Sequence, residues 1–200
     1  MKKLQAIIFD MDGLLVDSEP LWFEAERKVL RQVGINLDEK MNLETRGLRV
    51  DEGVDYWHKK YGWEQLSKEE VTQEILQTII SLVKEKGRLL PGAHMVIKLA
   101  HKLVDKVCLA SSSHIAMINV VLRKFKLNSF DCVHSAESEQ KGKPDPAVYL
   151  TTCAKVKAAP ENCLAFEDSV NGVKAAKAAG MKCIAVPAKE EFNDERFAIA

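Results

Sequence analysis

The sequence carries no excess of charge of either sign, because 29 Lys and Arg residues balance 29 Asp and Glu residues. It therefore lacks the basic character typical of proteins that bind nucleic acid or anionic membranes, and we expect neither partner. No apolar run reaches the ~18 residues that a membrane-spanning helix needs. The start of the chain resembles a signal peptide, but its apolar run meets acidic residues instead of a small-residue cleavage site, so we interpret residues 4–10 as a strand.

Cysteine is also scarce: there are five cysteines, an odd number, and no two are spaced as C-x-x-C. Four of them lie in or beside apolar, strand-like runs. This distribution is typical of free, buried thiols in a reducing compartment and argues against a disulfide framework or a cysteine metal site. We therefore expect a cytoplasmic protein. The cysteines are Cys108, Cys132, Cys153, Cys163 and Cys183.

Short apolar runs alternate with segments that have the apolar period of a helix. The predicted strands are residues 4–10, 106–111, 131–136, 163–168 and 182–187. The predicted helices between the later strands are residues 92–103, 114–125, 146–157 and 169–179. Strands that alternate with helices predict an α/β fold, in which a doubly wound parallel sheet is covered on both faces.

One interval breaks the alternation, because residues 17–87 contain no convincing strand. The helical patterns in it are residues 19–33, 38–46, 50–61 and 67–86. An all-helical cap inserted after the first strand is the simplest explanation. We therefore expect a core formed by residues 1–16 and 88–200 and a cap formed by residues 17–87.

Polar groups stand at or just after the ends of four predicted strands. They are Asp10, Asp12 and Gly13 after the first, Ser111 at the second, Lys141 and Lys143 after the third, and Glu167 and Asp168 at the fourth. The carboxyl ends of parallel strands meet at one edge of a doubly wound sheet, where ligands bind. Each feature alone is common as a helix cap or a solvated turn. Together they indicate one site for phosphoryl transfer.

The acidic residues of this edge suit a magnesium ion. The carboxylates of Asp10 and Asp168, with Glu167 nearby, are the hard oxygen ligands that Mg²⁺ prefers. The ion would let them stay ionised together, since one unscreened pair at about 4 Å costs about 4 kcal/mol at an effective dielectric constant near 20. Asp10 can attack phosphorus as a nucleophile. Asp12 can protonate the leaving oxygen and then activate water.

The remaining strand ends supply groups for the phosphate itself. Ser111 and Ser112, with the amides that open the following helix, can hydrogen-bond phosphate oxygens. Lys143 can supply a positive charge to the phosphate and to the nucleophile.

The motifs resemble those of the haloacid dehalogenase-like hydrolase superfamily, in its helical-cap, β-phosphoglucomutase-like branch. Its first motif, D-x-D-G-x-x-x-D-S, stands here as "DMDGLLVDS". The second motif matches Ser111, the third Lys143 and the fourth "FEDSVNG". The resemblance covers nearly the whole chain, although family members usually continue into a further strand and helix, whereas this sequence ends at Ala200.

The resemblance implies a Mg²⁺-dependent phosphatase that forms an aspartyl-phosphate on Asp10, with Asp12 as acid and base. The implied metal ligands are the Asp10 carboxylate, the Asp12 backbone carbonyl and Asp168, and Glu167 is a further candidate. Asp12 argues against a true dehalogenase, which lacks it. β-Phosphoglucomutases carry a cap histidine twelve residues after the nucleophile, where this chain has Trp22. Trp22 cannot transfer a proton, which favours release of phosphate to water.

The combination of "DSEPLW", "GLRVDE", "LLPG" and "FEDSVNG" looks most like bacterial phosphatases of 2-deoxyglucose 6-phosphate and hexitol phosphates. The cap must then select the substrate, and our candidates are Glu19, Trp22 and Arg49, with Gly47 allowing the "RGLR" loop to come close. The alternatives are a helix cap for Glu19, a cap-core residue for Trp22 and a surface cation for Arg49. The aromatic and basic patch at residues 56–63 is interpreted as helix packing rather than as a nucleic-acid site.

Other functions remain open. A β-phosphoglucomutase-like phosphosugar mutase would use the same aspartyl-phosphate. A phosphorylation-dependent switch also joins an aspartate, Mg²⁺ and a lysine, but receiver domains phosphorylate a middle strand and lack a large cap. A catalytically idle binding protein is disfavoured because no catalytic position is substituted. We expect a monomer that acts on a small phosphate monoester.

Overall fold

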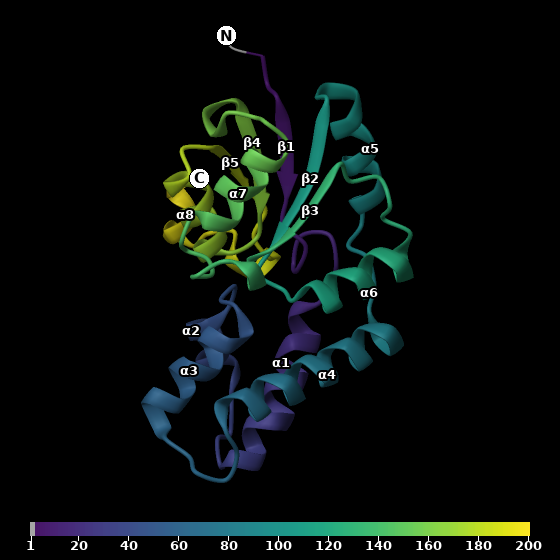
Figure 1. Cartoon of the computed structure of the whole chain (residues 1–200). Helices are drawn as coiled ribbons and strands as arrows, with labels where there is room; N and C mark the ends of the chain where they lie inside the picture. Colours follow the sequence, from purple (N-terminus) through teal and green to yellow (C-terminus); the bar gives the residue numbers. More distant parts are fainter. Residues whose placement is uncertain (1–2) are drawn as a thin grey trace.

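The computed structural model describes residues 3–200 and contains a five-stranded parallel sheet with helices on both faces (Figure 1). The strands are β1 (Ala6–Phe9), β2 (Lys106–Ser111), β3 (Cys132–Ser135), β4 (Cys163–Glu167) and β5 (Lys182–Ala185). They are ordered β3-β2-β1-β4-β5, and each neighbouring pair is parallel. The predicted α/β fold is confirmed, and each strand lies within the segment predicted for it.

The central strand β1 shows why the sequences of these strands are largely continuous apolar runs. Successive side chains of a strand point to opposite faces. Ala6 and Ile8 pack into one apolar cluster, and Ile7 and Phe9 into the other. All four are at most 3% exposed, because helices cover both faces.

Four helices provide that cover. They are α5 (Ala93–Leu103), α6 (Ile115–Phe125), α7 (Ala147–Lys155) and α8 (Val170–Ala178). Figure 1 shows α5 and α6 on one side of the sheet and α7 and α8 on the other. Ser169 caps the amino end of α8 by accepting a hydrogen bond from the Gly172 amide, as its position before the helix predicts.

A second group of helices lies beyond the carboxyl edge of the sheet (Figure 1). They are α1 (Glu19–Leu30), α2 (Glu39–Thr45), α3 (Val50–Tyr61) and α4 (Lys68–Lys86). α4 packs against both α1 and α3 and begins with a capping box formed by Ser67 and Glu70. The long pattern at residues 19–33 is α1 followed by a short 3₁₀ turn, which ends at Gly34 in the left-handed conformation.

The two chain segments that join these helices to the sheet run side by side. The Asp17 amide donates to the Arg88 carbonyl at 3.0 Å, and the Leu90 amide donates to the Leu15 carbonyl at 3.0 Å. Val16 also forms an isolated antiparallel bridge with Leu89. The division into a core and a cap at residues 16/17 and 87/88 stays a prediction, and these paired linkers support it.

The patch at residues 56–63 packs inside the helical group. Trp57 and Trp63 are 1% and 8% exposed, and the Trp63 ring meets His58 edge-on. Tyr61 is half exposed. The packing interpretation of this patch is therefore confirmed for its two tryptophans.

The five cysteines all lie among the described residues and are free. The Cys153 thiol donates a weak hydrogen bond to the Cys163 Sγ atom at 3.7 Å, and the two cysteines do not form a disulfide. Within residues 3–200 no helix combines the length and apolar composition required to cross a membrane.

Candidate active site

One cavity, of about 60 Å³, lies between the carboxyl edge of the sheet and the helices beyond it. The core side of its wall includes Asp10, Asp12, Ser111, Ser112, Lys143 and Asp168. The cap side includes Glu19, Trp22, Glu26, Thr45 and Arg46. The structure thus brings together the groups that the sequence places at four separate strand ends.

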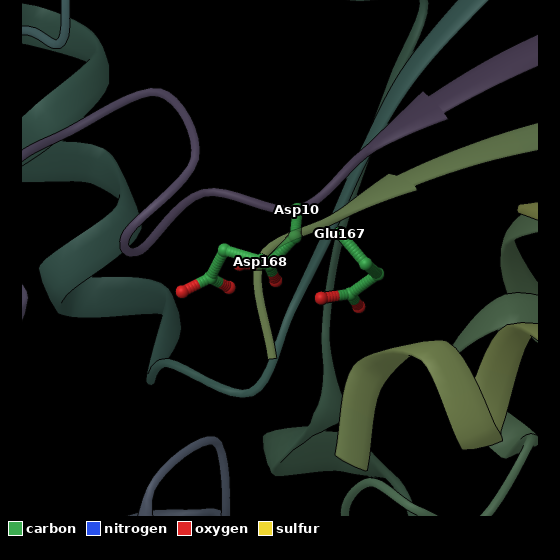
Figure 2. Close-up of side chains that lie close together, drawn as sticks. All are labelled: Asp10, Glu167 and Asp168. Carbon is green, nitrogen blue, oxygen red and sulfur yellow. The ribbon is translucent and has the colours of Figure 1, made fainter. Parts of the chain in front are cut away.

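Three buried carboxylates form the centre of the site. Asp10, Glu167 and Asp168 are 6%, 0% and 2% exposed, and each offers an oxygen within 4.8 Å of the others'. Figure 2 shows Glu167 and Asp168 pointing to opposite sides, with Asp10 between them. This divergence is expected of consecutive residues at a strand end. The Glu167 Oε2 atom is buried without a hydrogen-bond partner among the described residues.

The electrostatics of this cluster favour a bound cation. Burial raises the pKa of Asp10 well above its ordinary value, and although Lys143 opposes the shift, Glu167 and Asp12 add to it. Burial raises the pKa of Asp168 in the same way, with Glu19 and Asp10 adding to the effect. A divalent cation would favour the ionised forms of these groups. The oxygen donors and the unpartnered Glu167 atom therefore fit a hard metal ion.

Lys143 is the buried cation beside this cluster. Its Nζ donates to Asp10 Oδ1 at 2.7 Å and to Glu167 Oε1 at 2.6 Å, and the residue is 2% exposed. Burial lowers the pKa of Lys143, but the two carboxylates more than offset this and raise it above its ordinary value. The Tyr149 hydroxyl also donates to Glu167. Lys143 therefore stays charged and fixes the Asp10 carboxylate.

Asp12 is held by donors from both sides of the cavity. Its Oδ1 accepts from Ser18 Oγ at 2.6 Å and from Trp22 Nε1 at 3.1 Å. Its Oδ2 accepts from Ser113 Oγ at 2.7 Å and, more weakly, from Ser111 Oγ at 3.4 Å. From the sequence, Trp22 is a candidate for substrate contact with packing in the cap core as the alternative, and its contact with Asp12 is not predicted. Trp22 lines the cavity and also orients the second aspartate.

Arg46 is a site residue that sequence reasoning missed. Its guanidinium pairs with Glu19 at 3.0 Å, Asp168 at 3.1 Å and Glu191 at 2.6 Å. It thus joins the cap to the core across the cavity. Burial raises the pKa of Glu19 to about 7, although Arg46 opposes the shift. The segment "TRGLR" contains two arginines, and nothing in its pattern says which of them faces the site.

Arg49, the predicted candidate, is not among the residues that line the cavity. Its guanidinium bonds to Asp51 at 2.6 and 2.7 Å and to the carbonyls of Ala136 and Glu139 at 2.9 and 2.8 Å. The physical reason is its position directly before α3, where the acidic first turn of the helix attracts it. Arg49 instead connects the cap to the loop after β3.

The loop around Gly47 comes as close to the core as the sequence suggests. A Cβ at Gly47, whose φ is +77°, would lie 2.8 Å from Ser169 Oγ. Ser112 donates from its hydroxyl to the Gly47 carbonyl at 3.1 Å. Ser112 therefore lines the cavity but also holds the cap loop.

Comparison with known proteins agrees with this arrangement. The family model described as haloacid dehalogenase-like hydrolase matches residues 4–180. This chain belongs to the haloacid dehalogenase-like hydrolases. Hexitol phosphatase B of Escherichia coli K12 is 45% identical to this hydrolase over 201 residues, which cover 100% of this chain and 90% of the relative. A phosphorylated carbohydrates phosphatase of Thermotoga maritima is 33% identical over 90% of this chain and 84% of its own.

Solved structures share the fold of this hydrolase. The crystal structure of β-phosphoglucomutase from Clostridium difficile superposes with a TM-score of 0.81 at 27% identity. The match covers 95% of this chain and 87% of the mutase. The resemblance to the helical-cap branch is thereby confirmed.

Proposed function

We propose that this hydrolase is a Mg²⁺-dependent phosphomonoesterase that hydrolyses sugar and sugar-alcohol phosphates through an aspartyl-phosphate on Asp10. The observation that carries the proposal is the pairing of two differently held aspartates, Asp10 fixed by Lys143 and Asp12 fixed by hydroxyl and indole donors. The relatives named for hexitol phosphatase and for phosphorylated carbohydrates support the substrate class.

The reaction follows from the two aspartates. Lys143 engages Asp10 Oδ1, and we assign Oδ2 to attack the phosphorus atom. The bond to the leaving oxygen breaks as Asp12 transfers a proton to that oxygen. Asp12 then takes a proton from water, which attacks the phosphorus of the aspartyl-phosphate and releases phosphate and the Asp10 carboxylate. Ser111 and Ser112 are assigned to hydrogen-bond the phosphate oxygens.

The residues that would hold magnesium are Asp10, Asp168 and Glu167, with the backbone carbonyl of Asp12. When bound, the ion supplies positive charge that offsets the repulsion between these carboxylates and the substrate's phosphate. Lys143 adds fixed charge on the same side of the cavity.

The helices of residues 17–87 are assigned the selection of substrate, because the sheet edge supplies groups for the phosphate alone. Glu19 and Trp22 line the cavity from this side. We also assign the protein to the cytoplasm, in agreement with its free cysteines.

The test is phosphate release from a panel of hexitol, hexose and nucleotide monophosphates, with Mg²⁺ and again with EDTA. We expect metal-dependent release concentrated on the hexitol and hexose esters, and none from the Asp10→Asn variant. Release by Asp10→Asn at the wild-type rate would overturn the proposal. Conversion of a hexose 1-phosphate to its isomer without release would assign the mutase activity instead.

A further inference from the structure

One face of α1 lines the cavity from Glu19 to Glu26. Glu19, Trp22 and Glu26 all line the cavity and follow one another at helical positions i, i+3 and i+7. Glu19 pairs with Arg46, and the Trp22 indole donates to Asp12. Glu26 lies about 10 Å farther along the helix axis than Glu19, at 1.5 Å per residue.

No hydrogen bond within the part of the chain that the structure describes explains the position of Glu26. Its Oε2 atom is buried and makes no hydrogen bond within the described residues. An unpartnered polar atom of this kind costs stability, so a side chain kept there is expected to serve another purpose. Burial, with a smaller contribution from Glu19, raises the pKa of Glu26 to about 8. At neutral pH its carboxyl group is therefore protonated and offers both a donor and an acceptor.

The two cationic side chains that line the cavity already form ion pairs with carboxylates. Arg46 pairs with Glu19, Asp168 and Glu191, and Lys143 pairs with Asp10 and Glu167. If the substrate carried a second phosphate or a carboxylate near Glu26, that negative group would lie beside the acidic Glu26 side chain without a free cation among the described residues of the cavity wall to neutralise it. A hydroxyl group, which both donates and accepts, complements a protonated carboxyl group.

We propose that Glu26 hydrogen-bonds a hydroxyl group of the substrate at the end away from the phosphate and thereby selects phosphates of neutral, hydroxylated chains. This proposal rests on the phosphatase function proposed above. It assigns the phosphate end to Asp10 and Lys143 and the polyol end to Glu26.

The test compares two monoesters of equal chain length, sorbitol 6-phosphate and hexyl phosphate, which lacks the hydroxyl groups. In the Glu26→Leu variant we expect kcat/KM for sorbitol 6-phosphate to fall tenfold or more, the loss expected for one good hydrogen bond. The value for hexyl phosphate is expected to stay constant or rise. Glu26→Gln, whose amide also donates and accepts, is expected to keep the wild-type preference within about threefold. Glu26→Ala replaces the leucine variant if that protein fails to fold.

The matched control is Glu85→Leu, at an exposed position of α4 outside the cavity lining, which should change neither value. An unchanged preference for sorbitol 6-phosphate in Glu26→Leu would overturn the proposal. An equal loss on both substrates would also overturn it, because Glu26 would then support the site as a whole. If the wild-type enzyme hydrolyses neither ester, the phosphatase function itself fails, and this inference fails with it.

Discussion

Replacing Lys143 by methionine removes the buried cation that neutralises the site. Lys143 Nζ lies 2.7 Å from Asp10 and 2.6 Å from Glu167, and the lysine is 2% exposed. Methionine keeps most of the volume of the side chain, so the change leaves two buried carboxylates without their partner. Breaking a buried ion pair in this way costs about 3–5 kcal/mol. In a chain of this size, the midpoint of thermal unfolding falls by roughly 2–4 °C per kcal/mol. We therefore expect Lys143→Met to unfold about 6–20 °C below the wild type.

The pH dependence of this loss follows from the pKa shifts. Lys143 has a raised pKa in the folded protein, so its stabilising contribution is fully present below the ordinary lysine pKa. The pKa of Asp10 is already raised by burial and should rise further without Lys143. A carboxyl group with a raised pKa in the folded protein binds its proton more tightly there than in the unfolded chain. It therefore lowers the free energy of unfolding progressively as the pH rises above the pKa of the unfolded chain. The midpoint of thermal unfolding of Lys143→Met should therefore lie far below that of the wild type at pH 7 and close to it near pH 4.

The assay is thermal unfolding of both proteins in EDTA, followed by circular dichroism at several pH values. A midpoint that falls by less than about 2 °C at pH 7, or by the same amount at pH 4 and pH 7, would refute this reasoning.

Three further predictions concern other parts of the site. Gly172→Ala should lower both stability and activity, because the new Cβ would lie 2.0 Å from Glu167 Oε2. Ordinarily, alanine in place of glycine stabilises a helix by about 1 kcal/mol. Thermal unfolding and phosphate release measure the two effects. Trp22→Phe removes the indole donor to Asp12, so kcat/KM for hexyl phosphate, whose alkoxide leaving group needs the acid, should fall about fivefold, in line with one hydrogen bond of about 1 kcal/mol. The free energy of unfolding of the wild type should decline between pH 4.5 and pH 8, because Glu26 has a folded pKa of about 8. Glu26→Gln should decline less than the wild type over this range and be more stable by on the order of 4 kcal/mol at pH 8 in urea titrations, because Glu19, Asp10 and Asp168 keep their own raised pKa values.

The glycine and tryptophan substitutions each have a control. Gly53→Ala introduces a Cβ 3.9 Å from its nearest contact on Thr45 and should stabilise its helix. Trp63→Phe removes an indole donor outside the cavity and should leave kcat/KM unchanged. Equal behaviour of test and control variants would contradict the corresponding argument.

The sequence predicts the fold well because its signals are local and repeated. Strand β1 is apolar on both faces, and helix α8 begins with a capping serine and ends before a glycine. The strand ends carry their polar groups at positions that a parallel sheet necessarily brings to one edge. Asp10, Ser111, Lys143 and Asp168 could therefore be expected in one cavity before their geometry was known.

The cap side of the cavity could not be predicted in the same way. Which of Arg46 and Arg49 faces the site depends on how the chain turns at Gly47 and on the acidic residues that begin α3, and this is tertiary information. Trp22 reaches Asp12 because α1 starts directly over the sheet edge. Glu26 belongs to no sequence motif, and its Oε2 atom becomes buried only when α1 packs over the cavity.

The most direct test of the proposed mechanism is to trap the phosphorylated residue. The Asp12→Asn variant should still be phosphorylated by 4-nitrophenyl phosphate, whose leaving group needs no acid, but it should hydrolyse the intermediate slowly because the base is lost. Borohydride reduces an aspartyl-phosphate to homoserine, which peptide mass spectrometry locates in the chain. The mechanism predicts homoserine at position 10, formed only with Mg²⁺ and substrate present. A burst of nitrophenol without homoserine at that position would contradict it.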